Sequence, residues 1–202
     1  MSEQKFSHLN LKIEDGLAEL SLNRPKLHNA FNEKMIAELN SVFSALGQDP
    51  SVRVIFLKGE GPSFCAGADL HWMKSMASYS FEENLADAKK LHEMLLSIQQ
   101  CPKPVVAWVH GAVMGGGLGL VAACDMAYAV EDTQFAFTEV HLGLIPAVIS
   151  PFVLRKMGEG ALRELFLTGE RFSAKRAYEL GLIQVFASSQ DLEKILALKL
   201  KL

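Results

Sequence analysis

The residues best suited to chemistry lie in a glycine-rich run in the middle of the chain, Gly111-Ala-Val-Met-Gly-Gly-Gly-Leu-Gly119. A β-rich segment at 105–109 precedes the run, and a segment rich in alanine, valine and leucine follows it. Consecutive glycines let the backbone approach a ligand closely, and the first N–H groups of a helix lack partners within that helix. The run therefore predicts an anion-binding turn between a strand and a helix. Tight packing alone is the alternative explanation for its glycines.

A second candidate is Glu139, which lies in the mostly apolar run 135–142. Burial beside apolar side chains raises the affinity of a carboxylate for a proton, as a general acid or base requires. Judged on the residues alone, a glutamate that faces solvent at the end of a strand is the simpler interpretation.

Composition limits the class of protein. The chain has 202 residues, 50% of them hydrophobic, so one full core can be buried and we expect a single domain over residues 1–202. A formal net charge of −3 gives no basic field for nucleic acid or for an anionic membrane. The three cysteines form no C-x-x-C pair, which indicates reduced thiols and no metal site. Without a signal-peptide pattern or a membrane-spanning apolar run, we expect a cytoplasmic protein.

Strand and helix patterns alternate along the chain. A hairpin is predicted from the segments 9–13 and 17–22 around a tight turn, and further strands at 52–57, 105–109 and 126–130. Helices are predicted from about residue 32 to Gly47, from a capping box at 80–83, after the glycine run, and from residues 150, 159 and 173. This order predicts an α/β domain with mainly parallel strands.

Four ordered blocks resemble the enoyl-CoA hydratase/isomerase (crotonase) superfamily over essentially the whole chain. They are Leu22-Asn-Arg-Pro-Lys-Leu-His-Asn-Ala30; Phe64-Cys-Ala-Gly-Ala-Asp-Leu70; His110-Gly-Ala-Val-Met-Gly-Gly-Gly117 with Ala123-Cys-Asp125; and Phe135-Ala-Phe-Thr-Glu139 with Gly143-Leu-Ile-Pro146. The resemblance implies a crotonase-like spiral of ββα repeats with two roughly perpendicular sheets, assembled as a homotrimer or hexamer. It also implies an acyl-CoA thioester substrate and no cofactor beyond the coenzyme A that the substrate carries.

Reactions of this superfamily pass through an enolate-like oxyanion held by two backbone N–H groups. The resemblance assigns these donors to Ala68 and Gly116, the second at a helix N-terminus, where the macrodipole adds to the field. Asp69 is interpreted as the N-cap of the next helix, which would also fix the loop that carries Ala68. The resemblance further implies a coenzyme A path along two segments, with the residues Lys26, Leu27, Ala30, Ala66, Asp69 and Leu70. An acyl pocket is implied beside Trp72, Met73, Met76 and Leu142.

The catalytic acid–base role is assigned by resemblance to Glu139. Hydratases of the family usually carry a second glutamate two residues beyond the three consecutive glycines 115–117, where this chain has Gly119. One glutamate is enough to move a double bond, which favours an isomerase. His141 would be a second acid if residues 139–141 were extended, and otherwise it is a packing or surface histidine. Ala147 stands where dienoyl-type isomerases place an aspartate, which argues against that activity.

The segment 143–151 favours a hydratase. It resembles bacterial methylglutaconyl-CoA hydratase-like members, which also lack the glutamate at the position of Gly119. We therefore expect a lyase that adds water to a short branched 2-enoyl-CoA such as 3-methylglutaconyl-CoA, with Glu139 activating the water and returning its proton. An enoyl-CoA delta-isomerase that uses the same glutamate is the alternative.

The resemblance implies several more C-terminal helices than the one amphipathic stretch at 192–202, so we expect a shortened C-terminal helical region. A non-catalytic acyl-CoA-binding relative is therefore a third interpretation. Nucleic-acid binding through Lys89-Lys90 is not expected, because Asp87 and Glu93 flank this pair and the net charge is negative.

Overall fold

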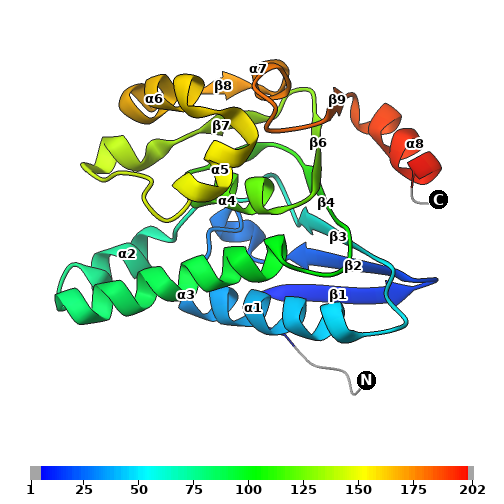
Figure 1. Ribbon diagram of the computed structural model, residues 1–202, viewed down its shortest axis with the longest axis horizontal. Helices are drawn as coiled ribbons and strands as arrows, with labels where there is room; N and C mark the ends of the chain where they lie inside the picture. Colours follow the sequence, from blue (N-terminus) through cyan, green and yellow to red (C-terminus); the bar gives the residue numbers. More distant parts are fainter. Residues whose placement is uncertain (1–5, 200–202) are drawn as a thin grey trace.

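The computed structural model describes residues 6–199, and within them the strands form two sheets (Figure 1). The larger sheet has the strand order β1-β2-β3-β4-β6-β9, and the smaller has the order β5-β7-β8. Neighbouring strands are parallel except in the β1–β2 and β7–β8 pairs. The strands are β1 (Leu9–Glu14), β2 (Leu17–Leu22), β3 (Val54–Gly59), β4 (Val105–Val109), β5 (Ala112–Met114), β6 (Met126–Val130), β7 (Gln134–Ala136), β8 (Phe172–Ser173) and β9 (Val185–Ala187).

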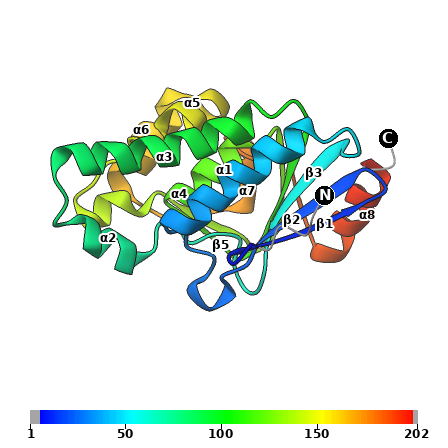
Figure 2. The ribbon, with the colours of Figure 1, turned by 90° about the horizontal axis from the view of Figure 1, so that it is seen from below.

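The helices cover both faces of the larger sheet. Two long helices, α1 and α3, pack against each other on one face, and α8 lies on the opposite face (Figure 2). The α-helices are α1 (Glu33–Gln48), α2 (Leu70–Met76), α3 (Phe81–Gln99), α4 (Gly116–Ala123), α5 (Ser150–Met157), α6 (Glu159–Thr168), α7 (Ala174–Glu179) and α8 (Ser189–Lys199). Two 3-10 helices, η1 (Pro25–Leu27) and η2 (Thr138–Leu142), lie in connecting segments.

Strand alternation explains why helices are needed on both faces. In β4, Val105 and Ala107 face the main core beneath α1 and α3, whereas Val106 faces a second apolar cluster. Successive side chains of a strand point to opposite faces, so a run of apolar residues requires cover on each side. Leu192 and Leu196 of α8 provide that cover for the second cluster.

The chain winds by placing one strand in each sheet and then a helix. β4 of the larger sheet leads to β5 of the smaller sheet and then to α4. β6 and β7 repeat this order and lead through η2 to α5. The predicted ββα repeats and the mainly parallel pairing are therefore confirmed.

Most of the predicted elements are present, with shifts at their ends. The hairpin, the capping box at Ser80 and the helix begun by Asn32 are confirmed. The third strand begins at Val54 and not at residue 52, and α1 continues one residue past Gly47. The short strands β5, β7, β8 and β9 were not predicted, because two or three residues are too few to show a period.

Residues 200–202 of the predicted C-terminal stretch lie outside the described part of the chain. Among residues 6–199, no helix combines the length and the apolar character needed to cross a membrane.

Replacing Leu192 by alanine is expected to lower the free energy of unfolding by about 2 to 5 kcal/mol, because its side chain is fully buried between α8 and the sheet. Leu198 of the same helix is 71% exposed, so Leu198→Ala is the matched control and should change stability by less than about 0.5 kcal/mol. Equilibrium unfolding in urea measures both. Equal losses in the two variants would show that α8 does not pack on the sheet as described.

Candidate active site

The glycine run makes the turn from β5 into α4. Gly115 has a φ of 49°, a conformation that favours glycine, and its N–H donates to the carbonyl oxygen of Ala136 in β7 at 2.9 Å. A Cβ at Gly116 would collide with the Phe31 ring, and a Cβ at Gly117 would lie 2.5 Å from the carbonyl oxygen of Cys65. Close packing thus accounts for two of the glycines. The Gly116 N–H is free: it donates to none of the described residues.

A second free amide belongs to Ala68, in the loop between β3 and α2. Phe31 holds this loop from both sides: its N–H donates to the Gly67 carbonyl at 2.8 Å, and its carbonyl accepts from the Asp69 N–H at 3.0 Å. The Ala68 N–H, between these two bonds, has no acceptor among residues 6–199. Ala68 and Gly116 line the same cavity of about 470 Å³. The structure therefore brings the two predicted donors together at one cavity wall.

Glu139 lies at the same cavity, on η2. Its Oε1 is 3.4 Å from the position that a Cβ of Gly115 would occupy, which places the carboxyl beside the start of α4. Its Oε2 is buried and has no hydrogen-bond partner among the described residues. Burial raises the pKa of this carboxyl above its ordinary value. A buried acceptor without a partner costs about 1 to 3 kcal/mol, so such atoms are uncommon in folded proteins.

The backbone around Glu139 differs from the extended segment in which His141 would be a second acid. Residues 138–142 form a 3-10 helix, so side chains two positions apart do not share a face. His141 Nε2 lies 3.2 Å from the Gly169 carbonyl oxygen, and the residue does not line the cavity. The role of His141 as a second acid is therefore excluded, because its imidazole is held in the contact between η2 and the end of α6.

Gly119 lies where a second carboxylate is expected in hydratases, and its surroundings are apolar. A Cβ at this position would lie 2.5 Å from Ile149 Cγ2 and 3.2 Å from Leu95 Cδ1. Ile149 is 2% exposed and Leu95 is fully buried. The space that a longer side chain at Gly119 would enter is therefore filled by apolar side chains.

The six residues predicted along the coenzyme A path all line the cavity of about 470 Å³, which is called the larger cavity below. Lys26 and Leu27 are exposed at its mouth, and Ala30 and Ala66 lie further in. Two histidines that were not predicted, His28 and His71, also line the cavity. Of the predicted acyl-pocket residues, Met73 and Leu142 line the cavity; Trp72 and Met76 do not.

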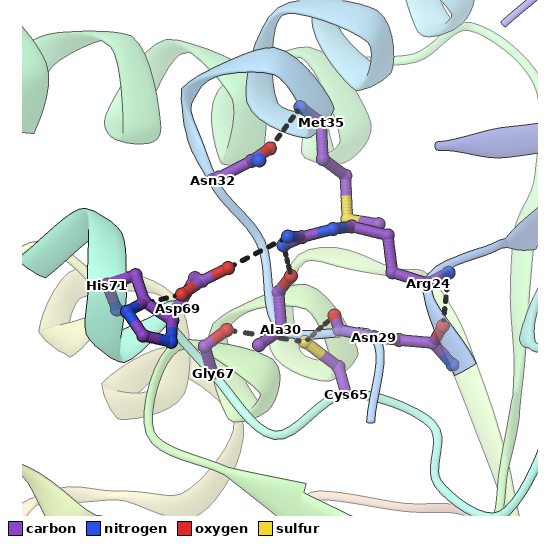
Figure 3. A network of polar contacts seen from close by, with 9 residues as sticks. All are labelled: Arg24, Asn29, Ala30, Asn32, Met35, Cys65, Gly67, Asp69 and His71. Atoms are coloured by element: carbon purple, nitrogen blue, oxygen red, sulfur yellow. Dashed lines mark hydrogen bonds and ion pairs between the residues drawn. The ribbon is translucent and has the colours of Figure 1, made fainter. Parts of the chain in front are cut away.

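Asp69 holds the loop at Ala68 in place through both of its carboxylate oxygens. Its Oδ1 accepts the His71 N–H at 2.8 Å, which confirms the predicted N-cap of α2. Its Oδ2 lies 2.8 Å from Nη2 of Arg24 (Figure 3). Arg24 was not singled out from the sequence, although it lies in the block Leu22-Asn-Arg-Pro, and its partner is far away in the chain.

A smaller cavity of about 170 Å³ shares Ala68, Gly116 and Glu139 with the larger one. Glu139 is the only ionisable residue in its lining. The other lining residues are apolar: Phe31, Leu91, Ile145, Pro146, Ala147, Val148 and Ile149. The two amides and the carboxylate thus lie where a partly polar cavity meets an apolar one.

Comparison with known proteins decides the family. The model of the enoyl-CoA hydratase/isomerase family matches residues 12–201. The chain belongs to the enoyl-CoA hydratase/isomerase family. It is 41% identical to an enoyl-CoA hydratase of solved structure from Shewanella pealeana, with a TM-score of 0.94, over 98% of this chain and 74% of that one. The match confirms the crotonase-like fold.

The relatives that match this chain include both hydratases and isomerases. The peroxisomal Delta(3,5)-Delta(2,4)-dienoyl-CoA isomerase of Arabidopsis thaliana is 36% identical over 86% of this chain and 66% of its own length. The crotonyl-CoA hydratase of Syntrophomonas wolfei is 31% identical over 93% of this chain and 72% of its own length. The chain thus spans about two thirds to three quarters of the length of these proteins.

Gly119→Ala is expected to destabilise the protein by about 1 to 3 kcal/mol, because the new methyl group would press on Ile149. In an Ile149→Ala background the same substitution should cost much less, since the obstructing side chain is gone. Urea unfolding of the two single variants and the double variant measures the coupling. If the two effects simply add, Ile149 does not fill the space beside Gly119.

Glu139→Gln is expected to stabilise the fold at neutral pH. The folded-state pKa of Glu139 is raised above the ordinary value of 4.5, so the stability that the protonated group contributes is lost as pH rises through the folded pKa. Glutamine does not ionise, so the advantage of the variant should be small near pH 4.5 and grow toward about pH 8. Thermal unfolding across this range measures it, with the exposed Glu131→Gln as control. An advantage that stays constant with pH would contradict the burial of the Glu139 charge.

Proposed function

We propose that the chain adds water to, or removes it from, a short 2-enoyl-CoA thioester. The Ala68 and Gly116 amides hold the thioester oxygen, and Glu139 is the only acid–base group. The observation that carries this proposal is the buried, unpartnered Oε2 of Glu139 at the cavity wall that also presents the two free amides. Membership of the enoyl-CoA hydratase/isomerase family supports it.

The larger cavity suits the coenzyme A part of the substrate. Lys26, His28 and His71 along it supply donors for phosphate groups, and exposed Leu27 and Leu70 offer apolar contact to the pantetheine chain. The proposed reaction requires no other cofactor. A homotrimer or hexamer and a cytoplasmic location are further proposals, made from the family resemblance and the composition.

The smaller cavity is assigned to the acyl group. Its volume of about 170 Å³ and its apolar lining suit a short acyl chain. The specific candidate, 3-methylglutaconyl-CoA, is proposed from the sequence resemblance. Its terminal carboxylate would meet no cation in the lining of this cavity. Comparison with the uncharged 3-methylcrotonyl-CoA therefore tests whether that carboxylate points into the cavity or out of it.

The proposed hydration uses one carboxylate, first as a base and then as an acid. Glu139 takes a proton from water while the water oxygen bonds to C3, and the electrons of the double bond move toward the thioester oxygen. The two amides stabilise the resulting oxyanion, and each such donor is worth about 3 kcal/mol of barrier. The protonated Glu139 then gives its proton to C2, which regenerates the carboxylate. Both new bonds form on the face where Glu139 lies, so the addition is syn.

Isomerisation is a second candidate because Gly119 supplies no second carboxylate for acid–base chemistry. Ile149 fills the space beside Gly119, and one base can take a proton from C4 and return it to C2. Both reactions use the same oxyanion and the same glutamate.

Glu139→Gln is expected to reduce kcat by about 10²-fold or more while leaving the affinity for a saturated acyl-CoA nearly unchanged. The assay uses crotonyl-CoA, 3-methylcrotonyl-CoA, 3-methylglutaconyl-CoA and a 3-enoyl-CoA, followed by mass and by the absorbance of the conjugated thioester. Exposed Glu131→Gln is the control and should retain activity.

The product separates the candidates. A mass gain of one water that is lost in the variant establishes a one-glutamate hydratase. Double-bond migration without a mass change establishes an isomerase. Acyl-CoA binding with neither reaction would make the chain a non-catalytic relative and overturn the proposal.

A further inference from the structure

The two amides of the proposed oxyanion site belong to different kinds of backbone, one to a helix and the other to a loop. Gly116 begins α4, whose remaining residues, 117–123, are all buried. Ala68 lies in a loop, and the position of its N–H depends on what holds that loop. Phe31 fixes the peptide groups on both sides of Ala68 through its two hydrogen bonds.

Arg24 bonds to both of the segments that meet in this backbone contact. Its guanidinium donates to the Ala30 carbonyl, next to Phe31, and to the Asp69 carboxylate, next to Ala68 (Figure 3). One planar group thus bridges the two segments that carry the contact. The second oxygen of Asp69 accepts the His71 N–H, which joins the loop to α2.

Arg24 is itself held firmly. Its backbone N–H donates to Asn29 Oδ1 at 2.8 Å, and Asn29 Nδ2 donates to the carbonyl oxygens of Glu60 and Ser63, each at 2.8 Å. Asn29 is fully buried and has a φ of 54°. A network that over-determines a strained residue in this way fixes local geometry.

The ion pair is shielded from solvent, with side-chain exposures of 13% for Arg24 and 9% for Asp69. Burial alone would raise the pKa of Asp69, but hydrogen bonds from Arg24 and the His71 backbone lower it below its ordinary value, so the carboxylate is charged. Buried ion pairs often add little net stability compared with apolar residues of the same size. A role in geometry explains the pair better than a role in stability.

We propose that Arg24 and Asp69 are positioning residues that set the direction of the Ala68 N–H relative to that of Gly116. Arg24 lines neither of the two cavities at the site, so it acts through the loop and not on the substrate. The inference rests on the proposed function, because it requires an oxyanion at these amides.

The test uses two conservative variants of the full chain. Arg24→Lys keeps the charge but replaces the planar fork by a single nitrogen, and Asp69→Asn keeps an acceptor for the His71 N–H but removes the charge. Each is expected to lower kcat by about 10- to 100-fold, as a misplaced donor does, with KM changed by less than about threefold. The control is Arg176→Lys, which alters a half-exposed i,i+3 pair with Glu179. The double variant should lose little more than either single variant, because both break the same contact.

A binding measurement separates positioning from folding. Acetoacetyl-CoA can bind as its enolate, whose conjugated oxyanion is detected by its ultraviolet absorbance, whereas butyryl-CoA presents only a neutral carbonyl. The affinity for the enolate should fall in both variants by a factor similar to that in kcat, and the affinity for butyryl-CoA should stay within about threefold.

Two results would overturn this inference in different ways. Unchanged enolate affinity and unchanged kcat per folded molecule, with only the melting temperature lowered, would make the pair purely structural and leave the proposed function intact. Failure of the unaltered chain to bind the enolate at all would overturn the proposed function, and the inference with it.

Discussion

The site depends on a backbone-to-backbone contact between the loop at Gly67 and the start of α4. A Cβ at Gly67 would lie 2.8 Å from the Met114 carbonyl oxygen, and a Cβ at Gly117 would lie 2.5 Å from that of Cys65. Each side of the contact thus excludes a side chain, and Gly67 also has a φ of 88°. Because the two backbones approach so closely, one cavity wall presents two amides that come from distant parts of the chain. A helix N-terminus at this wall adds its dipole to the field.

Two carboxylates line the cavity beside this contact, and their surroundings shift their pKa values in opposite directions. Asp69 receives hydrogen bonds from Arg24 and the His71 backbone, which hold its pKa down and keep it charged. Glu139 has a buried oxygen with no such partner among the described residues, so burial raises its pKa. Groups whose environments push their pKa values apart take different roles. Asp69 therefore suits a permanent structural charge, and Glu139 suits a group that gains and loses a proton.

The sequence was informative wherever the signal was local. Alternation predicted the hairpin of β1 and β2, and the caps at Asp69 and Ser80 located two helix starts. The glycine run predicted the turn into α4. Family resemblance then placed Ala68, Gly116 and Glu139, which the structure brings to one cavity.

What the sequence did not reveal depends on contacts between distant residues. Arg24 and Asp69 are separated by 45 positions, and neither has a local pattern that names the other. No local sequence pattern predicts the 3-10 helix at Glu139 either, because this segment packs against the end of α6 through His141 and Gly169. Ile149 was likewise invisible as the residue that fills the space beside Gly119, since 30 residues separate them.

Apolar side chains surround Gly119, the position at which hydratases of the family usually carry a glutamate. Ile149 and Leu95 occupy the space beside Gly119 and are themselves buried, so a carboxylate at position 119 would require repacking. In the proposed mechanism every proton transfer therefore passes through Glu139, from one side of the bound acyl group. With a single base, hydration and isomerisation differ in whether Glu139 first meets a water molecule or the C4 hydrogen of the substrate. We therefore expect the shape of the small cavity beyond Glu139, set by residues 145–149 and Leu91, to influence the choice of reaction more than the catalytic groups do.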